Sequence, residues 1–285
     1  MARQEVSVSQ LVSQIEKGYI QKPEMQREYV WKATRVRDLL DSLYRGYPSG
    51  TILLWETDSA VATTDFAVNT EKNNSTRPLL LLDGQQRLTT LYGVIRGKAP
   101  KFFEGDSNAF LGLRFNVEDE SFEFYSPAKM KGDSTWVDVT RLFQEDGLKP
   151  FIDEFKDPKY SEKFPTYLSR LSTLTNMLQR EFHLEKIVGK DKTTEVVVDI
   201  FNRVNSGGTK LSKGDLALAK ISAKSPGMRS AMRKELRNWD DNGFDFNLDW
   251  YLRNINAVAT GKSQFVHLDE DQSKSTSLAL SVRTY

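Results

Sequence analysis

The stretch LLLLDGQQRLTTLYGVIRG, residues 79–97, constrains the fold more than any other part of the chain. Its four leucines form a continuous apolar run of the length of a buried strand. The run ends at Asp83 and Gly84, and apolar residues then recur at helical spacing from Leu88 to Ile95. These residues predict a buried strand that turns through a glycine directly into a helix.

The turn has a purely structural explanation and a functional one. Asp83 and Gln86 are spaced almost as in a capping box, so half of the motif could simply mark the helix start. However, Gly84 would lie in the first helical turn, where glycine costs about 0.5–1 kcal/mol relative to alanine. Arg87 would lie near the positive end of the helix dipole, which disfavours a cation by up to about 1 kcal/mol. A bound anion between Gly84 and Arg87 would explain both residues, because helix-start amides and arginine bind phosphate oxygens.

The other motif residues suggest chemistry at such a phosphate. Gln85 and Gln86 could donate to phosphate or position a water, and Asp83 could hold a metal ion or orient that water. The sequence contains neither G-x-x-x-x-G-K-[ST] nor G-x-G-x-x-G. A nucleotide would therefore be bound by a scheme other than a P-loop or a dinucleotide fingerprint.

The composition excludes several classes of site. The chain has no cysteine and only two histidines, His183 and His267, which are far apart in sequence. Disulfides, thiolate metal sites and cysteine nucleophiles are excluded, and neither a zinc enzyme nor an HNH-type nuclease finds its ligands here. Lys and Arg total 40 against 39 Asp and Glu, so a DNA partner would need a local basic patch. The stretch RSAMRKELR, residues 229–237, is either such a patch or a solvated helix face.

The remaining patterns predict an α+β chain, with strands and helices followed by a mainly helical extension. Helical periodicity covers residues 8–15 and 36–43, short apolar strands cover 51–55 and 79–82, and alternation over 111–125 predicts a β-hairpin. We expect domains at 1–137, 138–225 and 226–285, the last leading to a C-terminal domain outside this chain. With no signal peptide and no run of about 20 apolar residues, we expect a cytoplasmic protein without a membrane partner.

The segment LLDGQQRLTTL, residues 81–91, resembles the signature of the DGQQR family, typified by the N-terminal half of GmrSD restriction enzymes and by the SspE phosphorothioation-sensing effector. Three further stretches agree with the family in the same order: QREYVW (26–31), YPSGTILLW (47–55) and FNRVNSGGTKLSKGDL (201–216). Four ordered blocks over about residues 8–220 are far more specific than one pentapeptide.

The resemblance implies a ParB/sulfiredoxin-like fold with a mixed sheet and helices, in which a Gly-x-x-Arg turn contacts nucleotide phosphates; Gly84 and Arg87 match that turn. It also implies hydrolysis of a nucleoside triphosphate, coupled to defence against phage DNA with or without chemical modifications. An HNH-type nuclease domain or subunit is expected in cis or in trans. Because this chain lacks the nuclease part, we do not expect it to cleave DNA alone.

The resemblance also extends the site to two other blocks. It places Gln26 and Arg27 beside the nucleotide, although Arg27 could equally be a surface arginine paired with a carboxylate. Tyr29 and Trp31 are expected to be core or wall residues. In the fourth block, the donors and glycines of NRVNSGG, at the end of a predicted helix, suggest a polar loop facing the same site, with a helical ion pair from Asp199 to Arg203 as the alternative. That loop contributes four candidate residues: Arg203, Asn205, Ser206 and Gly207.

The sequence thus predicts a sensor domain that binds a nucleoside triphosphate with Mg²⁺ and hydrolyses it slowly, with Asp83, Gln85, Gln86 and Arg87 as catalytic residues. The alternative is a nucleotide- or DNA-binding switch without turnover, similar to ParB-type clamps. A third interpretation is a scaffold in which the turn from Gly84 to Arg87 no longer binds phosphate. The base, the DNA modification and the oligomeric state, including a homo-oligomer, are left open.

Overall fold

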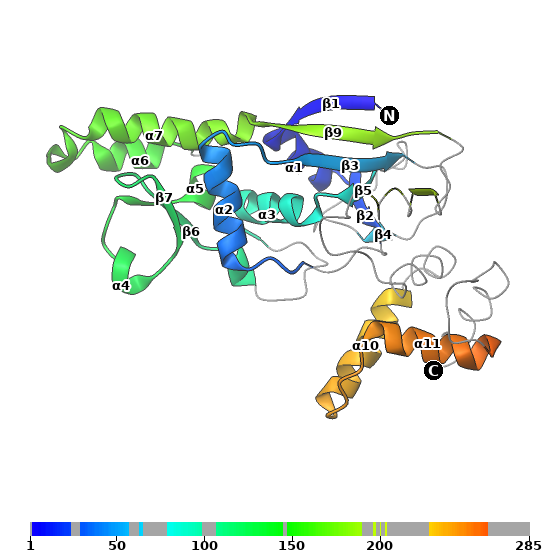
Figure 1. Ribbon diagram of the computed structural model, residues 1–285. Helices are drawn as coiled ribbons and strands as arrows, with labels where there is room; N and C mark the ends of the chain where they lie inside the picture. Colours follow the sequence, from blue (N-terminus) through cyan, green and yellow to red (C-terminus); the bar gives the residue numbers. More distant parts are fainter. Residues whose placement is uncertain are drawn as a thin grey trace.

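The computed structural model describes residues 2–23, 29–56, 63–64, 79–98, 107–144, 147–189, 196–197, 200, 203 and 228–261. Within them, helices surround a large mixed sheet and a small antiparallel sheet, so the expected α+β class is confirmed (Figure 1). The strands are β1 (Ala2–Ser7), β2 (Ile20–Pro23), β3 (Thr51–Glu56), β4 (Thr63–Thr64), β5 (Leu79–Asp83), β6 (Leu113–Asn116), β7 (Ser121–Phe124), β8 (Trp136–Asp138) and β9 (Glu181–Ile187). The α-helices are α1 (Val8–Glu16), α2 (Ala33–Tyr44), α3 (Gln85–Arg96), α4 (Pro127–Met130), α5 (Val139–Leu142), α6 (Lys149–Phe155), α7 (Phe164–Asn176), α10 (Met228–Asp241) and α11 (Leu248–Thr260). Three short 3₁₀ helices are also described: η1 (Ser107–Ala109), η2 (Pro158–Tyr160) and η3 (Met177–Gln179).

The large sheet has the strand order β1-β9-β3-β5-β2-β4 in the described residues. Strand β5 runs antiparallel to β3 and parallel to β2. Strand β9 is antiparallel to β1 and parallel to β3. The end of β5 therefore lies beside the start of β3, and this neighbourhood positions the candidate site.

The centre of this sheet is buried on both faces. Ile52, Leu54 and Leu81 belong to the main core, whereas other side chains of β3 and β5 face a second cluster. That second cluster contains Leu53, Trp55, Leu80, Leu82, Ile187 and Val197. Burial on both faces explains why the sequence of β5 is a continuous leucine run rather than an alternating pattern.

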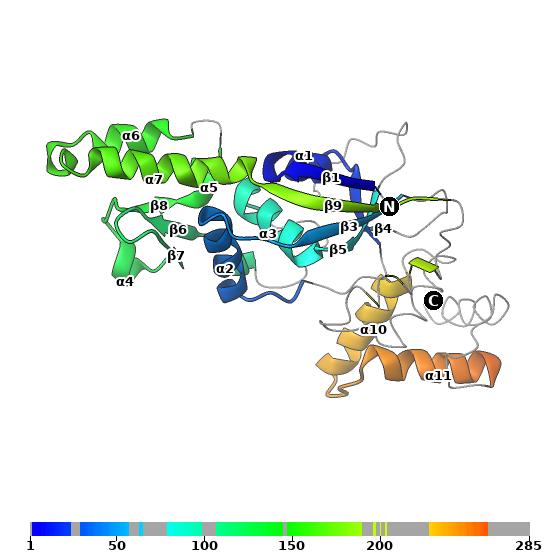
Figure 2. The ribbon, with the colours of Figure 1, turned by 45° about the horizontal axis from the view of Figure 1, so that its top comes forward.

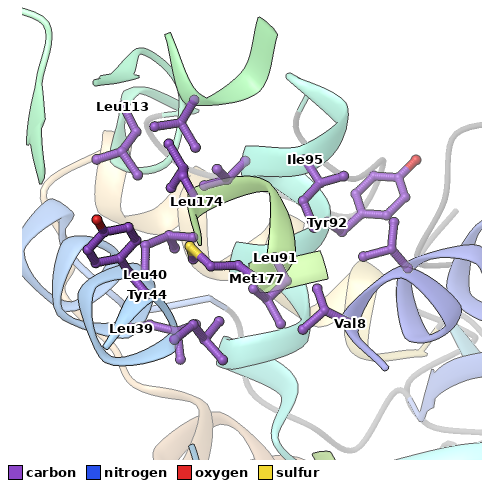
Figure 3. Packing of buried hydrophobic residues seen from close by; sticks show 14 of the residues in the cluster. Val8, Leu39, Leu40, Tyr44, Leu91, Tyr92, Ile95, Leu113, Leu174 and Met177 are labelled. Carbon is purple, nitrogen blue, oxygen red and sulfur yellow. The ribbon is translucent and has the colours of Figure 1, made fainter. Parts of the chain in front are cut away.

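Helices α1 and α3 contact each other within the main core, and the apolar faces predicted for both helices are buried there. Helix α1 has the expected capping box, with the Ser7 hydroxyl accepting from the Gln10 amide and the Gln10 side chain accepting from the Ser7 amide. Figure 3 shows side chains of α2, α3 and η3 meeting in this core, among them Leu40, Leu91 and Met177. The predicted helix face of α2 is buried in the same way.

The predicted β-hairpin is formed by β6 and β7, and β8 completes the small sheet in the order β7-β6-β8. Helices α6 and α7 follow, and α7 continues through η3 into β9 (Figure 2). Strand β9 lies within this mainly helical part of the chain and was not predicted from the sequence patterns; it inserts between β1 and β3. The division at 137 and 138 stays a prediction.

Helices α10 and α11 pack against each other around a small core of their own, formed by Met232, Tyr251, Leu252 and Ile255. They lie apart from the two sheets in both ribbon views (Figures 1 and 2). They account for the described part of the helical extension. None of the described helices combines the length and the apolar character needed to cross a bilayer.

Candidate functional site

The candidate site is the turn from β5 into α3. Its centre is Gly84, the N-cap of α3, which adopts a left-handed conformation with φ 93° and ψ 8°. The first helical hydrogen bond runs from the Leu88 amide to the Gly84 carbonyl, at 2.9 Å. A Cβ atom at Gly84 would lie less than 3.0 Å from Cδ1 of Ile52, so glycine is required by both the backbone and the packing.

This geometry corrects the expected capping box. Asp83 is the last residue of β5 and not the N-cap, and Gly84 has no side chain with which to cap the helix. Gly84 also precedes the first helical turn instead of lying in it. Helix α3 therefore starts without a side-chain cap, which leaves the positive end of its dipole uncompensated by a capping carboxylate.

Arg87 lies across this turn and bonds to three oxygens of the described chain. Its Nη1 donates to the Ser49 carbonyl at 2.6 Å, and its Nη2 donates to the Thr51 carbonyl at 2.8 Å and to Asp83 Oδ2 at 3.1 Å. Its side chain is only 17% exposed, and burial lowers the pKa of the guanidinium while Asp83 raises it. The cation near the positive helix end is thus compensated by oxygens of the protein itself.

Gly50 makes room for this arginine. It has a φ of 83°, and a Cβ atom there would come within 3.0 Å of Arg87 Nη1. Gly50 belongs to the YPSGTILLW block and Arg87 to the DGQQR block, so these two blocks form one structural unit. Nothing in the sequence assigned a role to Ser49, Gly50 or Thr51; the available signal was the glycine at the entry to a strand.

Gln86 joins a third block to the same turn. Its Oε1 accepts from the Val30 amide at 2.9 Å and from the Trp31 amide at 3.2 Å. Beside it, the Tyr29 hydroxyl and Thr90 Oγ1 are 2.9 Å apart, and burial raises the pKa of Tyr29 to about 12. Tyr29 and Trp31 pack against the main core, which confirms their expected place as core or wall residues.

Asp83 and Gln85 differ in accessibility. Gln85 is 7% exposed, whereas the Asp83 side chain is 34% exposed and its Oδ2 receives the bond from Arg87. In the described residues no group of three or more His, Cys, Asp or Glu side chains could hold a metal ion. A Mg²⁺ ion at this turn would consequently depend on the Asp83 carboxylate together with phosphate and water oxygens, a common arrangement for Mg²⁺ with nucleotides.

Several predicted site residues, namely Gln26, Arg27, Asn205, Ser206 and Gly207, lie outside the described residues. Arg203 is described as helical and exposed. Six residues before it, Val197 packs against the face of β3 and β5 that carries Leu53 and Leu82. The described parts of three blocks, at 29–31, 49–51 and 83–87, therefore converge on one turn.

Comparison with known proteins identifies the family to which these blocks belong. Residues 8–222 match the family described as the N-terminal domain of GmrSD restriction endonuclease, and this range contains all four sequence blocks. The chain is also 28% identical over 242 residues to the uncharacterized protein MJ0686 of Methanocaldococcus jannaschii. That match covers 74% of this chain and 40% of the relative, so the chain spans less than half of the relative's length. Because the family match covers most of its residues, the chain belongs to the family of GmrSD restriction endonuclease N-terminal domains.

Proposed function

We propose that this chain is a nucleotide-binding regulatory domain of a DNA-targeting restriction or phage-defence system, that it acts in the cytoplasm, and that it hydrolyses a nucleoside triphosphate slowly with Mg²⁺. Its nuclease partner would be an HNH-type domain in cis or in trans. Family membership supports the restriction context. The observation that carries the nucleotide proposal is the start of α3, where a left-handed glycine replaces a side-chain cap and is flanked by Asp83 and Arg87.

The phosphates would lie at the first turn of α3. Backbone amides and the helix dipole favour an anion there. Arg87 supplies a cation whose position is already set by Ser49 and Thr51, so little reorganisation is needed when a phosphate binds. Gln86 acts as a positioning residue in this proposal, because its side-chain oxygen holds the segment that carries Val30 and Trp31.

Asp83 is the residue that we propose for water or metal. Its carboxylate is the more accessible polar group of the motif, and Mg²⁺, when bound, would neutralise phosphate charge. Gln85, which is largely buried, would support the turn or contact the water from inside.

The other blocks complete the proposed site. In the sequence, Gln26 and Arg27 fall between β2, which is parallel to β5, and Val30, whose amide donates to Gln86. For this reason we keep both as nucleotide contacts. The same proposal retains Arg203, Asn205, Ser206 and Gly207, which follow the segment packed on β3 and β5.

One observation favours the second function, a switch that binds nucleotide or DNA without turnover. Arg87 already has three protein acceptors, and the Gln86 oxygen already accepts two amides. Fewer groups of the motif therefore remain for chemistry than the sequence alone suggested. A bound nucleotide would then act by ordering the turn.

The two functions are separated by calorimetry with ATP, GTP, CTP and UTP in Mg²⁺, followed by phosphate release with unmodified and modified DNA. The hydrolase predicts that Asp83→Asn retains nucleotide affinity and loses most phosphate release. Binding without release by the wild type under all conditions would favour the switch. If no nucleotide binds, the proposal that the start of α3 binds phosphate is wrong.

A further inference from the structure

Three aromatic rings form a stack between α10 and α11. The planes of Phe246 and Trp250 are 8° apart with ring centroids at 4.0 Å, and those of Phe244 and Phe246 are 9° apart with centroids at 6.0 Å. We call Phe244, Phe246 and Trp250 the aromatic ladder. All three ring planes are therefore nearly parallel, with Phe246 between the other two rings.

The ladder is held by a well-defined turn. Gly243 has a φ of 86°, and the Phe244 amide donates to the Trp239 carbonyl at 2.8 Å, which closes the end of α10. The side chain of Asn247 caps α11 by accepting from the Trp250 amide at 2.9 Å. Trp239 packs edge-on against Phe246 from behind, at 5.7 Å. The rings are therefore positioned by their own supersecondary unit.

The two outer rings are open to solvent, with Phe244 56% and Trp250 42% exposed. A single exposed aromatic residue is ordinary, but a supported stack with both ends exposed is not. Exposed clusters of this type mark surfaces that bind a partner.

The turn that carries the ladder is acidic, although the part of α10 that precedes it is basic up to Arg237. Between Trp239 and Trp250 the chain has four aspartates and neither lysine nor arginine. Asp249 pairs with Arg253 at 2.6 Å. Within the described residues no ion pair involves the other three, Asp240, Asp241 and Asp245.

Two of these aspartates also oppose the helix dipole. Asp240 and Asp241 are the last residues of α10, where the dipole is negative and a basic residue would be favoured; the last turn contains none. An incoming cation would compensate both the carboxylates and the helix end. The carboxylates of Asp240 and Asp241 thus lack a cation partner within the described residues.

We propose that the aromatic ladder and its aspartates bind an arginine-bearing segment of a partner protein. A guanidinium group is planar, stacks on aromatic faces and forms forked hydrogen bonds with carboxylates, so one side chain satisfies both features of the surface. Single-stranded nucleic acid also stacks on aromatic rings, but its phosphates would be repelled by the aspartates. Charge complementarity thus selects the basic protein segment.

The test is calorimetry of the whole chain with the synthetic nonapeptide Gly-Arg-Gly-Arg-Gly-Arg-Gly-Arg-Gly. Two further peptides carry lysine or the neutral analogue citrulline in place of arginine. We expect micromolar binding of the arginine peptide, several-fold weaker binding of the lysine peptide and none of the citrulline peptide. The variants Trp250→Ala and Asp240→Asn with Asp241→Asn should each weaken binding at least about tenfold.

Two controls keep the test specific. Trp250→Phe retains a ring and should bind nearly as the wild type, which separates stacking from misfolding. Tyr125→Ala removes an aromatic residue that is 46% exposed near the small sheet and should leave binding unchanged. The proposal is overturned if the arginine peptide does not bind, if citrulline binds equally, or if Trp250→Ala has no effect. It is also overturned if a single-stranded oligonucleotide binds more tightly, or if Trp250→Ala instead dissociates a dimer of this chain.

Discussion

Replacing Gly84 with alanine should destabilise the protein through two separable effects. The first is the backbone, because φ is 93° and alanine rarely adopts that conformation. The second is packing, because the new methyl group would lie less than 3.0 Å from Cδ1 of Ile52. Ile52 is fully buried in the main core, so it cannot swing into solvent to relieve the contact.

The two effects have estimable sizes. A left-handed conformation costs an L-residue about 1–2 kcal/mol, and overpacking a well-packed core costs about 1–3 kcal/mol. Alanine lowers the entropy of the unfolded chain, which offsets about 0.4–1 kcal/mol. We therefore expect Gly84→Ala to lower the free energy of unfolding by about 1–4.5 kcal/mol.

Gly132 offers a matched control. Its φ is 79°, but no other heavy atom would lie within 4 Å of an added Cβ atom. Gly132→Ala should therefore show the backbone effect alone, about 0–1.5 kcal/mol after the entropy offset. The difference between the two variants isolates the contact with Ile52.

Urea unfolding followed by tryptophan fluorescence and circular dichroism measures both variants, and an unchanged m-value would show that the comparison is valid. Ile52→Val removes Cδ1 and should partly rescue Gly84→Ala, giving a favourable coupling energy in a double-mutant cycle. Equal losses for Gly84→Ala and Gly132→Ala, with no coupling to Ile52, would refute the packing explanation.

Three further predictions concern the same turn. Arg87→Ala should lower the free energy of unfolding by about 2–4 kcal/mol, because two carbonyls and a carboxylate lose a charged donor. Under the nucleotide proposal, calorimetry should also show nucleotide affinity weakened at least tenfold, or by about 1.4 kcal/mol. Gln86→Leu should cost about 1–3 kcal/mol and speed hydrogen exchange at the Val30 and Trp31 amides, whereas unchanged exchange would show that the Gln86 oxygen does not hold them. The pKa of Tyr29 is about 12 in the folded protein and 10.0 in the unfolded chain. The stability that this shift contributes to the fold is therefore fully present below pH 10 and is lost as the pH rises towards 12. The stability difference between the wild type and Tyr29→Phe should change across that window in urea titrations at each pH, and a constant difference would contradict the shift.

Local patterns in the sequence were sufficient for most elements around the site. The helix faces of α1 and α2, the capping box at Ser7 and the leucine strand β5 all depend on interactions within a few residues or on the burial of one face. Such features leave a direct signature in periodicity. The four blocks of the resemblance lie in the range that the family comparison matches.

Strand β9 shows why the rest could not be predicted in this way. Its sequence EFHLEKI is short, and only Phe182, Leu184 and Ile187 are buried in it. It becomes a strand because β1 and β3 offer it hydrogen bonds on both sides. Those partner strands are more than a hundred residues away in the sequence, so local periodicity cannot indicate that β9 pairs with them.

The same limit explains the error at Asp83. The spacing of Asp83 and Gln86 satisfied a local capping rule, but both side chains have other partners: Asp83 pairs with Arg87, which is itself bonded to distant carbonyls at the start of β3, and Gln86 accepts amides from residues 30 and 31. With these bonds available, the helix starts one residue later, at Gly84, whose left-handed backbone conformation favours glycine.

Arg87 was correctly identified as unusual, but its position now has a cause within the protein. A cation at the positive end of α3 is tolerated because Ser49, Thr51 and Asp83 supply oxygens around it. Loss of nucleotide affinity in Arg87→Ala could then reflect a lost phosphate contact or a loosened turn. Asp83→Asn separates the two, because asparagine keeps an oxygen that can accept from Arg87, and the arginine keeps both carbonyl acceptors while the negative charge disappears. If the turn binds phosphate directly, removing that charge should leave affinity equal or higher while stability falls only slightly; if the Asp83–Arg87 pair merely supports the turn, affinity and stability should fall together.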